Sequence, residues 1–255
     1  MNYKNKAKNA FTIAEMAIVI CIIAILVSLT VIANGFIERG KAQSLVYEIT
    51  GYQKMIDAFR MTYNSLPGDF ERASTDINSA IKNGNGNGKY DVLADGTGES
   101  FLAWQHLNYA GIIPDKYTGM TVMAGSQICS IGLNIPRSKI FPNAGYRITS
   151  EIPLEISQNS NMSKYKTIME YASYATQTST GRGTTGIVTP DIAYDVDNKM
   201  DDGKPLEGFV LGLNDVSNKC NSTTFNVSTG GYSSGATYID SKNTGCIMVF
   251  VATEY

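Results

Sequence analysis

The distribution of apolar and polar residues sets apart the first stretch of the chain. Residues 11–33, FTIAEMAIVICIIAILVSLTVIA, form an almost unbroken apolar run. About 20 apolar residues in a helix are enough to cross the hydrocarbon core of a bilayer, so the run predicts a transmembrane helix. One acid, Glu15, lies about a turn inside it. A carboxylate is costly in a membrane and therefore suggests a partner, although an acid at headgroup depth would need none.

Residues 34–64 continue the helical pattern in amphipathic form. Apolar side chains recur at steps of three and four, as on one face of a helix. They are Leu45, Ile49, Tyr52, Ile56, Phe59 and Tyr63. We expect one helix from about Thr12 to about Tyr63, with its apolar stripe covering the rest of the chain. Pro67 and Gly68 predict its end.

Residues 65–255 predict a globular domain, because Gly, Asn, Ser and Thr become frequent and the long helical period is lost. A short helix is expected over 98–111. Short strands are expected at 146–148, 154–156, 208–213 and 247–253. The predicted fold class is therefore α+β: a long N-terminal helix packed on a C-terminal domain with a small antiparallel sheet.

The charges around the apolar run predict the orientation of the chain. Lys4, Lys6 and Lys8 precede the run without any acid, and Arg39 and Lys41 follow it. This slight positive-inside bias places the N-terminus in the cytoplasm and the rest of the chain outside. The net charge is −2, and it becomes −5 without the three leading lysines. Such mild acidity argues against a general attraction to nucleic acid.

The junction Ala10-Phe11-Thr12-Ile13-Ala14-Glu15, after a basic leader and before an aliphatic run, resembles the start of type IV prepilins and type II secretion pseudopilins. The resemblance implies a leader of residues 1–10, cleavage by prepilin peptidase between Ala10 and Phe11, and methylation of the Phe11 amine. It also implies an assembly role for Glu15, whose carboxylate pairs in the family with the amine of a neighbouring subunit. The family usually has Gly before the cut, where this chain has Ala10.

Four further blocks, at 63–69, 103–111, 135–140 and 195–203, resemble prepilin-type proteins with a large globular end. The resemblance to this family implies a pilin-like fold and a role as a structural subunit of a type IV pilus, a type II secretion pseudopilus or a related filament. Its implied partners are other subunits, prepilin peptidase, an inner-membrane assembly platform and the lipid bilayer. The alternative is a signal-anchored exported domain, binding or enzymatic, that does not polymerise.

The chain has four cysteines, and their surroundings differ. Cys21 lies in the apolar run, where it acts as a small apolar residue. Cys220 and Cys246 flank a polar, Gly-rich segment in the part expected to meet an oxidising compartment, so we predict a disulfide between them. Cys129 is left over and could instead pair with either.

Two segments have the composition of metal-binding loops. Asp195, Asp197, Asp201 and Asp202 lie close together in sequence and could supply oxygen ligands to Ca²⁺, although a solvated acidic turn has the same composition. The Asn-Gly run at 83–88 copies a calcium loop only superficially, since neutral amides occupy its first ligand positions. A flexible turn is the expectation there.

The sequence does not predict an enzyme. Its one histidine, His106, could be imagined as a base beside Cys129, but nothing in the sequence brings the two together. The chain contains no Gly-rich phosphate loop, zinc-ligand spacing or catalytic-triad motif.

Overall fold

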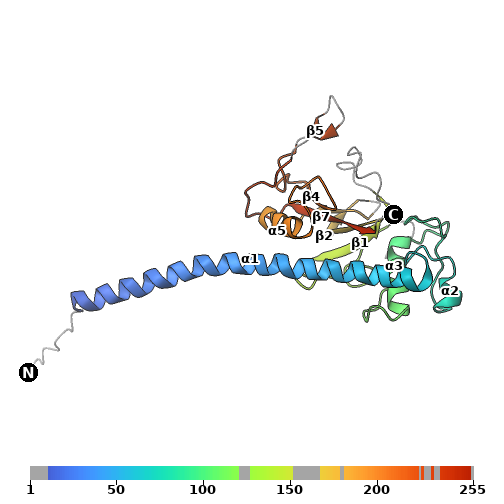
Figure 1. Ribbon diagram of the computed structural model, residues 1–255, viewed down its shortest axis with the longest axis horizontal. Coiled ribbons are helices and arrows are strands. Elements are labelled where there is room, and N and C mark those ends of the chain that lie inside the picture. Colours follow the sequence, from blue (N-terminus) through green and yellow to red (C-terminus); the bar gives the residue numbers. More distant parts are fainter. Residues whose placement is uncertain are drawn as a thin grey trace, which may run out of the picture. The chain divides into compact units, whose positions relative to one another are not determined.

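The computed structural model describes residues 11–120, 127–151, 167–178, 181–223, 225–226, 231–232 and 236–253. It has the α+β class expected from the sequence, with a long N-terminal helix and a small antiparallel sheet (Figure 1). The chain divides into two compact units, Met1–Gly40 and Lys41–Tyr255. The expected leader, residues 1–10, lies outside the described residues.

Helix α1 spans Ile13–Tyr63, close to the expected bounds. Asn64 follows the helix with a left-handed φ of 50°, and its N–H still donates to the carbonyl of Arg60 at 2.8 Å. Asn tolerates this conformation at a helix C-terminus, and the following Pro67 cannot extend the helix. Among the described residues, α1 is the one helix that contains a stretch long and apolar enough to cross a membrane, and this stretch lies in its first part.

The second unit is built on a five-stranded sheet in which every pairing is antiparallel. Four strands follow the order β1-β2-β7-β4, and β3 pairs with the later part of β2. The strands are β1 (Ala144–Thr149), β2 (Thr167–Gln177), β3 (Gly183–Thr185), β4 (Val210–Asn214) and β7 (Cys246–Thr253). A separate ribbon pairs β5 (Phe225–Asn226) with β6 (Gly231–Tyr232).

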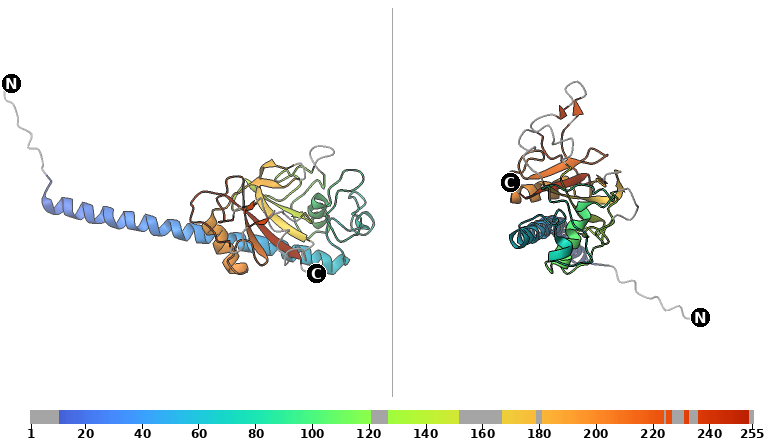
Figure 2. Two further views of the ribbon diagram at one scale, coloured as in Figure 1. Left: turned by 90° about the horizontal axis from the view of Figure 1, so that it is seen from above. Right: turned by 90° about the vertical axis from the view of Figure 1, so that its right-hand side faces the viewer.

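Three shorter helices complete the described part of this unit: α2 (Ala73–Asp76), α3 (Glu99–Tyr109) and α5 (Pro190–Met200). Figure 2 shows α3 and α5 at different ends of the sheet, with α3 packed on β1 and α5 on β4 and β7. The expected helix at 98–111 and the strands at 146–148, 208–213 and 247–253 correspond to α3, β1, β4 and β7. The expected strand at 154–156 lies outside the described residues.

The apolar stripe of α1 forms one side of the core. Leu45, Ile49, Ile56 and Phe59 are fully buried. Tyr52 contacts Trp104 of α3 edge-on, with ring centroids 5.2 Å apart, and Tyr146 of β1 at 4.8 Å. The stripe therefore covers the rest of its own unit, as the spacing predicts.

Candidate functional site

The start of α1 is a capping box, which the sequence analysis did not identify. Thr12 donates from its backbone N–H to Glu15 Oε2 at 2.7 Å and from its hydroxyl to the same oxygen at 2.9 Å. The Glu15 N–H in turn donates to Thr12 Oγ1 at 3.2 Å. This reciprocal pattern satisfies orphan donors of the first helical turn, and its Thr-x-x-Glu signature is readable in the sequence.

Glu15 is surrounded by exposed apolar side chains. Phe11 is 80% exposed and Ile13 is 91% exposed, and every described side chain from Phe11 to Thr30 is solvent-exposed. Within the described residues, Thr12 supplies all the hydrogen bonds of the Glu15 carboxylate. Ala10, the expected cleavage position, lies outside the described residues. The site thus consists of an apolar surface that needs a nonaqueous partner and one carboxylate satisfied only by its own turn.

A second glutamate of α1, Glu48, has partners from distant parts of the chain. Glu48 Oε2 accepts hydrogen bonds from the hydroxyls of Tyr146 at 2.7 Å and Ser138 at 2.9 Å, and Oε1 accepts from the Lys139 N–H at 2.9 Å. Burial, with smaller contributions from Tyr171 and Glu48, raises the pKa of Tyr146, which remains a neutral donor. Glu48 therefore links the amphipathic part of α1 by hydrogen bonds to the loop before β1 and to β1 itself.

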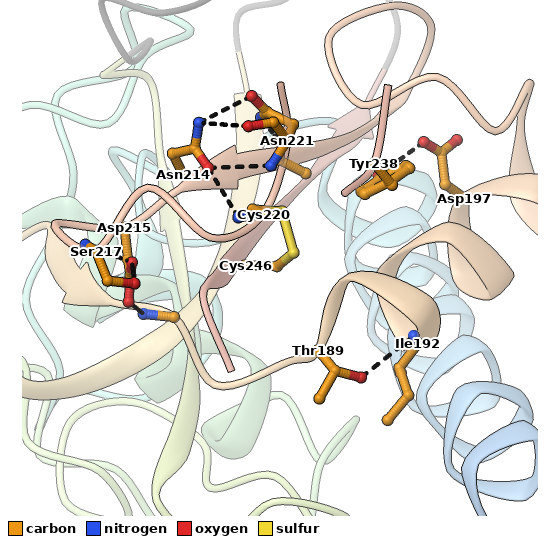
Figure 3. Close-up of a disulfide and its surroundings, with 12 residues drawn as sticks. Thr189, Ile192, Asp197, Asn214, Asp215, Ser217, Cys220, Asn221, Tyr238 and Cys246 are labelled. Atoms are coloured by element: carbon orange, nitrogen blue, oxygen red, sulfur yellow. Dashed lines mark hydrogen bonds between the residues drawn. A yellow bond between two sulfur atoms is a disulfide. The ribbon is translucent and has the colours of Figure 1, made fainter. Parts of the chain in front are cut away.

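The predicted disulfide between Cys220 and Cys246 is present, with Cα atoms 4.7 Å apart (Figure 3). It joins the start of β7 to the loop after β4, and the Asn214 side chain accepts the N–H of Cys220 at 2.8 Å and that of Asn221 at 3.0 Å. Closing a loop of this length stabilises the fold by about 3 kcal/mol. Cys129 is free and buried, so its alternative pairing is excluded.

The acidic segment is not the turn that its composition suggests. Asp195 and Asp197 lie on helix α5, because Thr189 caps its N-terminus, Pro190 occupies its first turn, and Ile192, Ala193 and Val196 bury one face. Carboxylate oxygens of Asp197, Asp201 and Asp202 lie within 4.8 Å of one another, and Asp195 is not in this group.

The three clustered carboxylates already accept hydrogen bonds from the loop that follows α5. Asp197 accepts from the Gly203 N–H at 3.1 Å. It also accepts from the Tyr238 hydroxyl at 2.8 Å (Figure 3). Asp201 accepts from the N–H groups of Phe209 and Val210. Burial raises the pKa of Asp197 to about 7. The cluster therefore organises this loop, and calcium binding stays a prediction for titration to test.

The imagined catalytic pair is not assembled. His106 Nδ1 accepts the Gly68 N–H at 2.9 Å and its Nε2 contacts the Lys82 carbonyl oxygen at 2.8 Å, so both ring nitrogens are engaged by the backbone. The Cys129 thiol donates to the Gly181 carbonyl at 3.3 Å, and burial raises its pKa to about 12. A neutral, buried thiol is a poor nucleophile.

An ion-pair network on the sheet was not predicted. Arg147 of β1 stands opposite Glu170 of β2 in the strand register, with Nη1 and Oε2 3.9 Å apart. Glu170 is 1% exposed and also accepts from the Gly183 N–H at 2.8 Å and the Tyr174 hydroxyl at 3.2 Å. The network links β1, β2 and the start of β3, and a buried pair of this kind need not add net stability, because desolvation of its charges offsets their attraction. Its partners lie too far apart in sequence to form a recognisable motif.

No protein-family model, no curated protein and no solved structure matches this chain. The features that bear on function are therefore the start of α1, the exposed apolar surface around it and the disulfide between Cys220 and Cys246.

Proposed function

We propose that this protein is a prepilin-like subunit of a type IV pilus, a type II secretion pseudopilus or a related filament. The observation that carries the proposal is the apolar, solvent-exposed first part of α1, whose one acid has no described partner beyond its own first turn. This predominantly apolar surface suits either lipid or the matching surfaces of other copies. The subunit is first held in the inner membrane and then moves into a filament.

The membrane orientation follows from the same proposal. The N-terminus faces the cytoplasm, and the second unit is exported, where its disulfide can form. Prepilin peptidase, an inner-membrane assembly platform and sibling subunits are the proposed partners. The disulfide supports export, since such bonds are uncommon in proteins that stay in the cytosol.

Processing is the first test. We expect cleavage between Ala10 and Phe11 and methylation of the new Phe11 amine. Mass spectrometry of the mature N-terminus in cells that express a prepilin peptidase decides this, with a peptidase-deficient strain as the control. A product that begins at Met1, or one cut near Ala33, would contradict the proposal that this protein is a prepilin.

The second test concerns the charge of Glu15. The capping box allows two variants that separate this charge from the capping hydrogen bonds. Glu15→Gln keeps an acceptor for Thr12 but removes the charge, whereas Thr12→Ala removes the side-chain half of the cap and keeps the charge. If Glu15 pairs with an incoming amine, Glu15→Gln abolishes sheared surface filaments or secretion, and Thr12→Ala does not. Membrane levels of both variants should equal wild type.

The capping box also favours a second candidate function, a signal-anchored domain that does not polymerise. In that case Glu15 only caps its helix, and the carboxylate needs no second molecule. Glu15→Gln would then behave as wild type in every assay. Substitution of Ala10 separates the candidates again: a filament subunit accumulates as precursor, whereas an anchored protein runs unchanged on a gel.

A further inference from the structure

The loop 83–88 contains three consecutive Asn-Gly pairs, a sequence with its own chemistry. The glycine backbone nitrogen can attack the carbonyl carbon of the preceding asparagine side chain, because glycine has no side chain to hinder the approach. A carbon–nitrogen bond forms, ammonia leaves, and a succinimide ring results. Water then opens the ring to aspartate or isoaspartate, so the reaction needs no other reagent.

The fold requires the three glycines. A Cβ atom at Gly84 would lie 2.3 Å from the carbonyl oxygen of Gly68 and 2.4 Å from backbone atoms of Asp69. Gly86 and Gly88 have φ of +71° and +77°, a conformation that favours glycine. The reactive pairs therefore cannot be removed by replacing glycine without strain.

Each of the three attacking nitrogens is held by a hydrogen bond. Gly84 N–H donates to the Phe70 carbonyl and Gly86 N–H to the Asp69 carbonyl, both at 2.9 Å. Gly88 N–H donates to the Asp69 carboxylate at 2.7 Å. An amide fixed in this way cannot turn toward the side chain of its own neighbour.

The asparagine side chains are held as well. Asn83 Oδ1 accepts the Ser74 N–H at 2.7 Å, and Asn87 Oδ1 accepts the Lys89 N–H at 2.9 Å. Asn85 Oδ1 accepts the Asn87 N–H at 3.1 Å. All three asparagines are exposed, so water can reach any succinimide that forms.

Two buried carboxylates accept hydrogen bonds from backbone N–H groups of the loop. Asp69 is 2% exposed and accepts the N–H groups of Asn87 and Gly88. Glu99 is fully buried and accepts those of Asn85 and Asp91, both at 2.8 Å. Asp69 therefore holds two neighbouring residues of the loop, and Glu99 ties the loop to Asp91, so losing either carboxylate frees a segment that contains an Asn-Gly pair.

We propose that Asn83–Gly88 is a latent deamidation site, which Asp69 and Glu99 keep closed and which reacts when their hydrogen bonds break. The reaction is a one-way switch. A new carboxylate at position 85 or 87 would join Asp69, Asp91 and Glu99, and burial together with Asp69 and Asp91 already raises the pKa of Glu99 to about 7. The added charge prevents the loop from closing again.

The test uses the full-length chain in detergent micelles. Peptide mapping by mass spectrometry measures conversion of the asparagine amides to acids, and an isoaspartyl methyltransferase detects isoaspartate. We expect slow conversion in the folded chain and conversion many-fold faster in urea. Asp69→Asn and Glu99→Gln should each accelerate it several-fold under conditions where circular dichroism shows both variants folded.

Asp197→Asn is the matched control. Asp197 is also a buried carboxylate that accepts a glycine N–H, from Gly203, but it lies away from the loop. The control should leave conversion at 83–88 at the wild-type rate. Acceleration at the loop equal to that of Asp69→Asn would show that general loosening is responsible and would overturn the proposal. So would equal rates in the folded and the urea-denatured wild type. If Asp69→Asn does not fold, Glu99→Gln decides.

Discussion

Glu15 and Glu48 lie on one helix, yet their surroundings are opposite. Glu15 belongs to the first unit and is bonded only by Thr12, three residues away. Glu48 belongs to the second unit and is bonded by Tyr146, Ser138 and Lys139, all about 90 or more positions further along the chain.

The contrast separates stability from function along α1. The chain itself supplies the partners of Glu48, so Glu48 contributes to the folding of one subunit. Within the described residues the chain supplies Glu15 with a local cap only. The same division applies to the apolar side chains, which are buried at Ile49 and exposed at Ile25. If the division holds, substitutions in the second part of α1 change the unfolding of the second unit, and substitutions in the first part do not.

The largest effect is expected from Ile49→Ala. Ile49 is fully buried, so truncation should lower the free energy of unfolding by about 4 kcal/mol through lost burial and a residual cavity. The matched control is Ile25→Ala, the same change in the same helix at a residue that is 61% exposed. Urea unfolding followed by tryptophan fluorescence at Trp104 measures both. A comparable loss for Ile25→Ala would mean that the two parts fold as one.

Glu48→Ala should cost about 3 kcal/mol, because the buried hydroxyls of Tyr146 and Ser138 lose their acceptor. Glu48→Gln keeps one acceptor oxygen and should lose less. The same unfolding experiment measures both variants. A wild-type midpoint for Glu48→Ala would show that these hydrogen bonds contribute nothing net.

Acid should weaken the second unit through His106, which stacks on Phe59 of α1 with ring centroids 6.2 Å apart. Burial lowers the pKa of His106 from 6.5 to about 4. The unfolded chain therefore binds more protons between these values, and stability is lost as the pH falls from 6.5 toward 4, by up to about 3 kcal/mol. Protonation of Nδ1 removes the acceptor of the Gly68 N–H.

The measurement must separate His106 from the acids. Burial raises the pKa of Glu99 and of Asp197 to about 7, so these two groups stabilise the fold as the pH falls through that value and oppose the effect of His106. Subtracting the stability of His106→Gln from that of wild type at each pH removes their contribution. The difference should shrink toward acid, and a constant difference would contradict the assignment to His106.

The smallest effect is expected from Glu15→Gln, which should leave the thermal midpoint of the second unit unchanged. Its carboxylate is exposed and bonded only to Thr12. Calorimetry in detergent measures the midpoint. A shift comparable to that of Glu48→Ala would erase the distinction between the two glutamates.

Local patterns in the sequence predicted much of the fold. The period of Leu45, Ile49 and Ile56 identified the buried face of α1, and compartment and composition identified the bridge between Cys220 and Cys246. Thr12 and Glu15 have the spacing of a capping box, so that contact was readable and was overlooked.

What the sequence did not reveal depends on contacts between distant residues. Residues 167–174 of strand β2 are buried on both faces and include Glu170, which pairs with Arg147 of another strand, so no alternation of polar and apolar residues marks this strand. Helix α5 was obscured by its acidic composition, although Thr189 and Pro190 are good start signals. The partners of Glu48 lie beyond any local window.

The sheet order has a consequence for biosynthesis. Strand β7 lies between β2 and β4, yet it follows both in the chain. Until residues 246–253 have been synthesised, β2 and β4 each keep an unpaired edge, and the disulfide lacks one of its cysteines. The growing chain therefore carries an unfinished sheet, whose exposed edges are open to other chains. Helix α1 is complete long before the sheet can close, so correct folding depends on keeping those edges away from other chains in the interval.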